Sequence, residues 1–272
     1  MAYRRTKILI LCKTYPSPSA SYVETSCVAG MEANGRLLRL YPVPFRLLAD
    51  QSRFKKWQWI EADVEKRKDD HRPESHGIRA DTIVRQGDPL PTLHDWAIRR
   101  EQLALLERFD NFSALDHARV TRGVTLGLLP AGRILSLEVT AAKTPDWSEE
   151  ERQKLIQQQQ QGDLFSDPEA AALRTLRKLP FNFHYTYRAP TDVEGVKNRH
   201  KIVDWEAGAL YWKLRERHGE GWEPRFRDKF GVQLPSSDLM FLMGTIHRFP
   251  EQWLIVSVIY PPKQRQQSLG LE

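Results

Sequence analysis

The sequence predicts an α+β protein, built mainly from β barrel-like sheets with flanking helices. Apolar runs at residues 7–13, 239–246 and 253–260 have the length of buried strands, and each is followed within a few residues by proline. Residues 181–187 alternate aromatic and other side chains with the two-residue period of a strand. Helix-start signals are fewer and stand between these runs. Strands should therefore form the framework, with helices beside it.

The first part of the chain is predicted to be a β-rich N-terminal domain over residues 1–146. Asn34-Gly35 favours a tight hairpin turn between two strands, and Asp95 is expected to cap a helix. Pro130-Ala131-Gly132 favours a second turn, between strands that we expect to pair with each other. The expected elements are, in chain order, strands at 7–13, 37–41 and 57–64, a helix at 95–109, and paired strands at 124–129 and 133–140.

The rest of the chain divides into three predicted parts. Residues 147–180 should form a helical connector, because Ser148 opens one capping signal and Asp167 opens a second, with a glutamine tract between them. Residues 181–262 should form a C-terminal α+β part that packs with the N-terminal sheet, including a helix capped by Asp204. Residues 263–272 follow two prolines and are expected to be a flexible tail.

Composition favours an anionic partner. The 272 residues contain 41 Lys and Arg against 35 Asp and Glu, a formal charge of +6. Such a balance suits nucleic acid, and we expect DNA rather than RNA. The two cysteines form no Cys-x-x-Cys pair, which argues against a zinc knuckle or redox motif. No apolar run reaches membrane length, so we expect a cytoplasmic, nucleoid-associated protein with no membrane partner.

Two glutamine-led peptides resemble the motifs by which proteins bind the bacterial sliding clamp. Residues 161–165 read Gln-Gly-Asp-Leu-Phe and resemble the pentapeptide form, although its second position is often apolar and here is Gly162. Residues 266–271 read Gln-Gln-Ser-Leu-Gly-Leu and resemble the C-terminal hexapeptide form. The resemblance covers only these two peptides and implies recruitment to the clamp through the following residues: Gln161, Asp163, Leu164, Phe165, Gln266, Leu269 and Leu271.

Both peptides stand where such capture is physically feasible, one between two helix signals and the other in the tail. The apolar side chains would enter a preformed pocket, while the glutamine sets the register. Binding at both sites would act in avidity on a clamp with several pockets. The alternative is that Leu164 and Phe165 only dock their own loop onto the core.

Basic and aromatic residues mark three candidate nucleic-acid surfaces, since basic groups neutralise phosphates and aromatic rings stack on bases. The alternative for each is an ordinary solvated face, and for either Trp57 or Trp59 a place in the core. A third, weaker cluster lies near Arg215. The candidate contacts in the first two clusters are Arg39, Arg46, Arg53, Lys55, Lys56 and Trp57, and then Lys197, Arg199 and Lys201.

Two clusters have the residue types of a metal-dependent nuclease, which uses carboxylates and histidines to hold a cation and activate water. The alternative is a solvated charged turn. No Walker A, dinucleotide-binding, zincin or nucleophile-elbow motif occurs. We therefore expect neither a cofactor nor a bound metal. The candidate catalytic residues are Asp70, His71 and Glu74 in one cluster and His200, Asp204 and Glu206 in the other.

These observations favour a DNA-associated accessory protein, recruited to the replication clamp, that binds nucleic acid and has no enzymatic activity. A mobile-element or anti-phage defence context would suit such a protein. The first alternative is the metal-dependent nuclease. The second is an interaction module inside a larger complex with other subunits.

Overall fold

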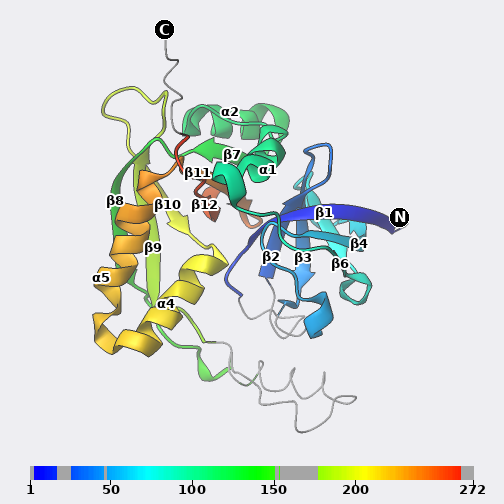
Figure 1. Cartoon of the computed structure of the whole chain (residues 1–272), viewed down its shortest axis with the longest axis horizontal. Helices are drawn as coiled ribbons and strands as arrows, with labels where there is room; N and C mark the ends of the chain where they lie inside the picture. The colour runs from blue at the N-terminus through cyan, green and yellow to red at the C-terminus, as the bar shows by residue number, and fades with distance from the viewer. Residues whose placement is uncertain (1–2, 17–25, 46–47, 151–152, 154–176, 265–272) are drawn as a thin grey trace.

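The fold contains two six-stranded sheets that lie side by side (Figure 1). The computed structural model describes residues 3–16, 26–45, 48–150, 153 and 177–264. The glutamine tract, the peptide at 161–165, most of the predicted helical connector and the peptide at 266–271 lie outside the described residues. Within the described part, no helix combines the length and apolar character needed to cross a membrane.

The N-terminal sheet closes into a barrel, which confirms the predicted barrel-like sheet. Its strands follow the order β1-β2-β3-β5-β4, and β1 pairs with β4 to complete the circle. Gly35 has a φ of 82°, which glycine adopts without strain, so the predicted β2–β3 hairpin is confirmed. The strands are β1 Arg4–Lys13, β2 Ser26–Met31, β3 Leu37–Val43, β4 Trp59–Lys66 and β5 Ser75–Ile78. The sixth strand of the sheet, β6 Val84–Gln86, pairs antiparallel with the start of β4.

The second sheet has the order β7-β11-β12-β10-β9-β8. The predicted pairing of the strands around Pro130-Ala131-Gly132 is wrong, because β7 and β8 lie at opposite edges of this sheet. The turn links two edges of a curled sheet, with Ala131 N–H donating to the Leu239 carbonyl at 2.9 Å. The strands are β7 Leu126–Pro130, β8 Arg133–Ala141, β9 Phe181–Arg188, β10 Asn198–Ile202, β11 Met240–Ile246 and β12 Phe249–Ile259.

The pairing in this sheet places the division between the two sheets earlier in the chain than the predicted boundary at residue 146. Strands β7 and β8 come before residue 146, yet all their sheet partners are the C-terminal strands β9 and β11. The two sheets therefore separate between β6 and β7 and not at residue 146. Hydrogen bonding across the predicted boundary explains the difference, since strand pairing depends on partners far along the chain.

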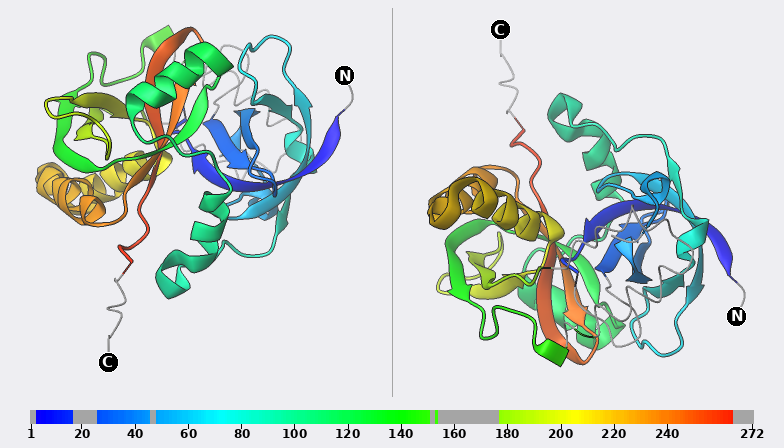
Figure 2. Two further views of the ribbon diagram at one scale, coloured as in Figure 1. Left: turned by 90° about the horizontal axis from the view of Figure 1, so that it is seen from above. Right: turned by 90° about the horizontal axis from the view of Figure 1, so that it is seen from below.

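Most of the helices pack against the second sheet and share its core. In Figure 2, α4 and α5 lie together along this sheet, and α4 begins next to the barrel. Asp204 caps α4 as predicted, by accepting the Glu206 N–H at 2.9 Å. Asp95 does not cap α1, whose N-cap is Thr92, and it lies with His94 and Trp96 in the left-handed region. The helices are α1 Leu93–Ala104, α2 Phe112–Arg122, α4 Trp205–His218 and α5 Trp222–Arg227, and a π-helical turn spans Asp228–Gln233.

Strand β1 is buried on both faces, which explains its unbroken apolar sequence. Ile8 and Ile10 point into the barrel, where they pack with side chains from the other barrel strands. Leu9 and Leu11 point outward and pack against the second sheet, including Leu242 of β11. The outward face of β1 therefore belongs to a cluster that the barrel and the second sheet share, while its inward face belongs to the barrel interior.

Candidate functional site

Charged side chains converge where the barrel meets the start of α4. The end of β1 lies beside this helix because Tyr15 N–H donates to the Val203 carbonyl at 2.9 Å and Thr14 forms a β-bridge with Asp204. A hollow of about 210 Å³ opens at this junction. We call it the lysine pocket, and it is lined by Lys13, Lys55, Lys56, Asp204, Trp205 and Glu206.

Lys56 forms the base of the lysine pocket and joins the two halves of the structure. Its ammonium lies 3.5 Å from Asp204, 3.1 Å from Glu206 and 2.9 Å from the Val258 carbonyl, to which it donates. Burial by itself would lower the pKa of Lys56, but the Asp204 and Glu206 carboxylates raise it above its usual value. Asp204 also accepts the Val258 N–H at 2.8 Å. Lys56 is thus an internal cation and not the surface phosphate contact that the sequence suggested.

Lys13 lies higher in the same pocket, within a group of aromatic rings. Its ammonium is 3.7 Å from the Phe45 ring centroid and 5.2 Å from that of Trp205. Burial lowers the pKa of Lys13 to about 8, partly offset by Glu206 and Asp204. Lys13 is not among the predicted site residues, because a lysine at the end of an apolar strand gives no sign of what it faces.

Lys55 completes the pocket from its open side. Its side chain is exposed, and the described residues provide no ion pair for it. Lys13 likewise forms no ion pair within the described part, although it donates to the Phe54 carbonyl at 3.3 Å. Two lysines without an ion pair among the described residues therefore line one small hollow beside an indole ring. Such a hollow has room for a single anionic group, being smaller than the roughly 300–1,000 Å³ of ordinary ligand sites.

The first predicted nucleic-acid cluster is divided by the fold. Arg39 is 3% exposed and is bound to Glu74, and Trp57 is also 3% exposed, packing at 5.7 Å from Trp96. Neither can contact a nucleic acid, because both are enclosed in the core. Arg53 is exposed beside Asp50, at 2.7 Å. Arg46 lies outside the described residues.

The second predicted cluster lies on β10 and just before it. Arg199 and Lys201 share the face of the strand opposite to buried Ile202. Arg199 forms an ion pair with Glu138 at 2.9 Å, and burial lowers the pKa of Lys201. Lys197 is exposed. None of these groups lines the lysine pocket.

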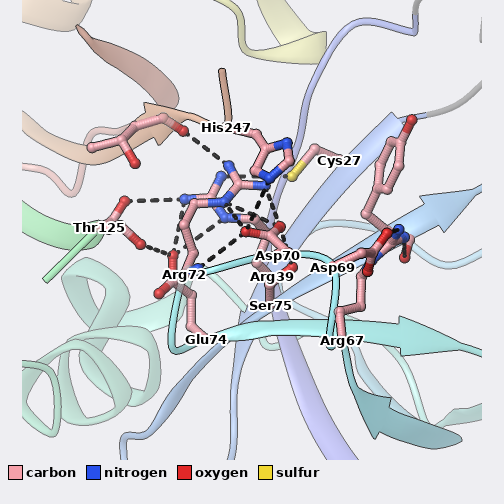
Figure 3. A network of polar contacts seen from close by, with 12 residues as sticks. Cys27, Arg39, Arg67, Asp69, Asp70, Arg72, Glu74, Ser75, Thr125 and His247 are labelled. Carbon is pink, nitrogen blue, oxygen red and sulfur yellow. Dashed lines mark hydrogen bonds and ion pairs between the residues drawn. The ribbon is translucent and has the colours of Figure 1, made fainter. Parts of the chain in front are cut away.

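The acidic cluster on the β4–β5 loop is held by two buried arginines (Figure 3). Asp70 binds Arg72 at 2.6 Å, and Glu74 binds Arg39 at 3.1 Å and accepts from the Thr125 hydroxyl. Burial would raise the pKa of Asp70, but hydrogen bonds from Arg72 and Ser75 hold it well below its usual range. Asp70 and Glu74 therefore have different partners and do not form one carboxylate site.

The other predicted catalytic cluster does not assemble. His200 packs against Phe112 at 4.4 Å, and its Nδ1 lies 3.1 Å from the Tyr187 hydroxyl. Burial and the nearby His184 lower the pKa of His200 to about 4. Asp204 and Glu206 instead bind Lys56, so this group has no shared centre. Among the described residues, these three do not form a group whose ligand atoms could hold one ion.

The fold and its pocket define an α+β protein with a closed barrel joined to a helix-covered sheet. Residues 109–272 match the family model described as "Domain of unknown function (DUF8757)", and the chain belongs to that family. Residues 4–104 match "Domain of unknown function (DUF8758)". The two matches meet between α1 and α2, where the chain passes from the barrel to the second sheet.

Comparison with characterised proteins adds little to this assignment. No curated protein matches the chain in sequence. One similar solved structure is titled "Structure of murine DNA binding protein bound with ds DNA", with 8% sequence identity and a TM-score of 0.32. The alignment covers 96% of this chain and 98% of that one. A score this low carries no argument about the fold or function of this chain.

Proposed function

We propose that this protein is a DNA-associated accessory protein that binds nucleic-acid phosphate at the lysine pocket and is recruited to the sliding clamp. The observation that carries the proposal is the pair of lysines, Lys13 and Lys55, that line one hollow and have no ion pair among the described residues. Trp205 lines the same hollow. A phosphate between the two lysines would leave the neighbouring base or sugar beside this indole.

The electrostatics of the pocket support an anion of this kind. The carboxylates of Asp204 and Glu206 are bound to Lys56 below, so they are partly neutralised. Because the pKa of Lys13 is about 8, most of this side chain is protonated at pH 7. The first turn of α4 adds the partial positive charge of a helix N-terminus. Backbone phosphate is read without regard to sequence, which suits an accessory protein.

Fluorescence anisotropy with labelled single- and double-stranded DNA, measured over a range of salt concentrations, tests the phosphate contact. Lys13→Ala and Lys55→Ala should each weaken binding and reduce the slope of log K against log salt by about 0.7–0.9, the contribution of one phosphate contact. Lys213→Ala is the matched control, because Lys213 is an exposed lysine further along α4. If both pocket variants match this control in affinity and in salt slope, the pocket is not the nucleic-acid site.

Size-exclusion chromatography with purified clamp tests recruitment separately. The motif resemblance supports it, and both peptides lie outside the described residues. A Leu164→Ala, Phe165→Ala double variant should lose most of the co-elution, and truncation after Gln264 should lose a smaller part. Co-elution unchanged by the two alterations together would refute clamp recruitment and leave DNA binding standing.

A further inference from the structure

We infer that Asp70, His71 and His247 form a binding site for a divalent transition-metal ion such as Zn²⁺. One potential ligand atom from each side chain lies within 4.8 Å of the other two. Asp70 and His71 come from the β4–β5 loop of the barrel, whereas His247 lies in the β11–β12 turn of the second sheet. In Figure 3 the His247 ring lies against the Asp70 carboxylate and Arg72. The site therefore spans the two halves of the structure.

The separation of the two imidazole rings fits a single shared ion. A zinc–nitrogen bond of about 2.1 Å places the ring centroid about 3.2 Å from the metal, so two tetrahedral imidazoles have centroids about 5 Å apart. The centroids of His71 and His247 are 5.4 Å apart, and the two rings are stacked with 20° between their planes. A metal ion lies in the plane of each imidazole that binds it, so at least one ring must turn out of the stack to share the ion. Both side chains are exposed, which leaves them free to turn.

Asp70 is held in place for the third ligand position. Its Oδ2 accepts from Arg72 Nη2 at 2.6 Å and from the Ser75 hydroxyl at 2.6 Å. Its Oδ1 lies 3.9 Å from His247 Nε2, on the side where the ion would bind. Hydrogen bonds to a carboxylate from surrounding groups commonly orient metal ligands in this way.

Binding of the ion has a cost at Oδ1, which already accepts the Arg72 backbone N–H at 3.1 Å as well as the Arg72 side chain. Arg72 Nε donates to Oδ1 at 2.9 Å and to Oδ2 at 3.2 Å, so it must give up the first of these bonds to the metal. The guanidinium keeps its bonds to Oδ2 and its bond from Nη1 to the Thr245 carbonyl. The loop geometry therefore survives the exchange, because Arg72 still joins the β4–β5 loop to β11.

The residue types and the surroundings indicate which ion and which further ligands fit. Two imidazoles and one carboxylate suit zinc and its neighbours, whereas magnesium and calcium prefer oxygen ligands alone. A hollow of about 350 Å³ adjoins the cluster at His71 and is also lined by Arg119 and Arg122. Water or an anionic oxygen group, such as a phosphate ester, would complete the coordination there.

Isothermal titration of chelator-treated, untagged full-length protein with ZnCl₂ tests this site. We expect one saturable site per chain, with affinity reduced at least about tenfold in His71→Ala and in His247→Ala, as expected for loss of a ligand. His117→Ala is the matched control, because His117 is an exposed histidine on α2 outside the cluster. Zinc should also raise the thermal midpoint of the wild type and of His117→Ala, but not that of His247→Ala.

The outcomes that would overturn the inference are equally specific. One is the absence of saturable zinc binding to the wild type. Another is binding to His247→Ala that equals binding to His117→Ala. Because His247 lies on an exposed turn, its loss should leave the near-ultraviolet circular dichroism spectrum unchanged, so reduced binding cannot be ascribed to unfolding.

Discussion

Replacing Lys56 with alanine should destabilise this protein strongly, while the same change at the adjacent Lys55 should not. Lys56 has a side chain only 10% exposed, and its ammonium donates to Asp204, Glu206 and the Val258 carbonyl. Lys55 is exposed, and the described residues give it no ion pair. The two variants remove the same atoms from neighbouring positions and so form a matched pair.

The size of the stability loss depends on the charges that each substitution leaves unpaired. Breaking a buried ion pair by removing one partner costs about 3–5 kcal/mol, because the other charge remains enclosed. Asp204 keeps its hydrogen bonds from the Glu206 and Val258 N–H groups, and Glu206 is 45% exposed, so the low end applies. We expect a loss of about 3 kcal/mol for Lys56→Ala. Lys55→Ala should change stability by about 0.5 kcal/mol or less.

Urea unfolding followed by tryptophan fluorescence measures both values, and the eight tryptophans give ample signal. In thermal melts the loss in Lys56→Ala corresponds to a midpoint lower by about 6–12 °C in a protein of this size. Lys56→Met keeps most of the apolar stem and should lose nearly as much, because the carboxylates are still left unpaired. If the two alanine variants differ by less than about 1 kcal/mol, the assignment of Lys56 as a buried structural cation is wrong.

Two further predictions concern pH. DNA affinity should fall between pH 7 and pH 9. Burial lowers the pKa of Lys13 to about 8, so this side chain loses its charge over that range. In anisotropy titrations, Lys13→Arg should remove most of the fall in affinity. The folded protein should lose stability as the pH falls from about 6.5 towards 4, because burial holds the pKa of His200 at about 4 while the unfolded chain takes up a proton near 6.5. His200→Gln should reduce this loss in urea titrations at pH 4.5 and pH 7, and an unchanged difference between the two pH values would refute the buried, neutral histidine.

Signals that involve residues close together in the chain predicted the corresponding elements well. The apolar run of β1, the aromatic alternation of β9, the Asn34-Gly35 turn and the Asp204 cap all appear in the structure as expected. Each depends on the period of a strand or on one local hydrogen bond. The β7–β8 pairing failed because a turn signal says only that the chain reverses, and not which strand it will meet.

The candidate sites were harder to predict, because their residues converge from distant segments. Asp70 and His71 stood out as adjacent polar residues, but nothing in the sequence connected them with His247. Lys55 and Lys56 look alike in the sequence, yet one is exposed and the other is buried against α4. Trp57 has a φ of 68° and precedes β4, so it is not part of the strand that was expected to begin there.

The sequence by itself determined the α+β class, the positions of most strands, the basic balance of charge and the resemblance to clamp-binding peptides. These properties depend on composition and on patterns among residues close together in the chain, so they do not require knowledge of the folded structure. The tertiary structure alone decided which charges face solvent. Each enclosed charge lies beside a charge of opposite sign, because an isolated charge in the core would have a far higher free energy than one that has an ion pair and hydrogen bonds. The enclosed charges include Arg39, Lys56, Asp70 and Asp204. The groups left open to a ligand are Lys13 and Lys55 in the lysine pocket and the exposed histidines beside Asp70.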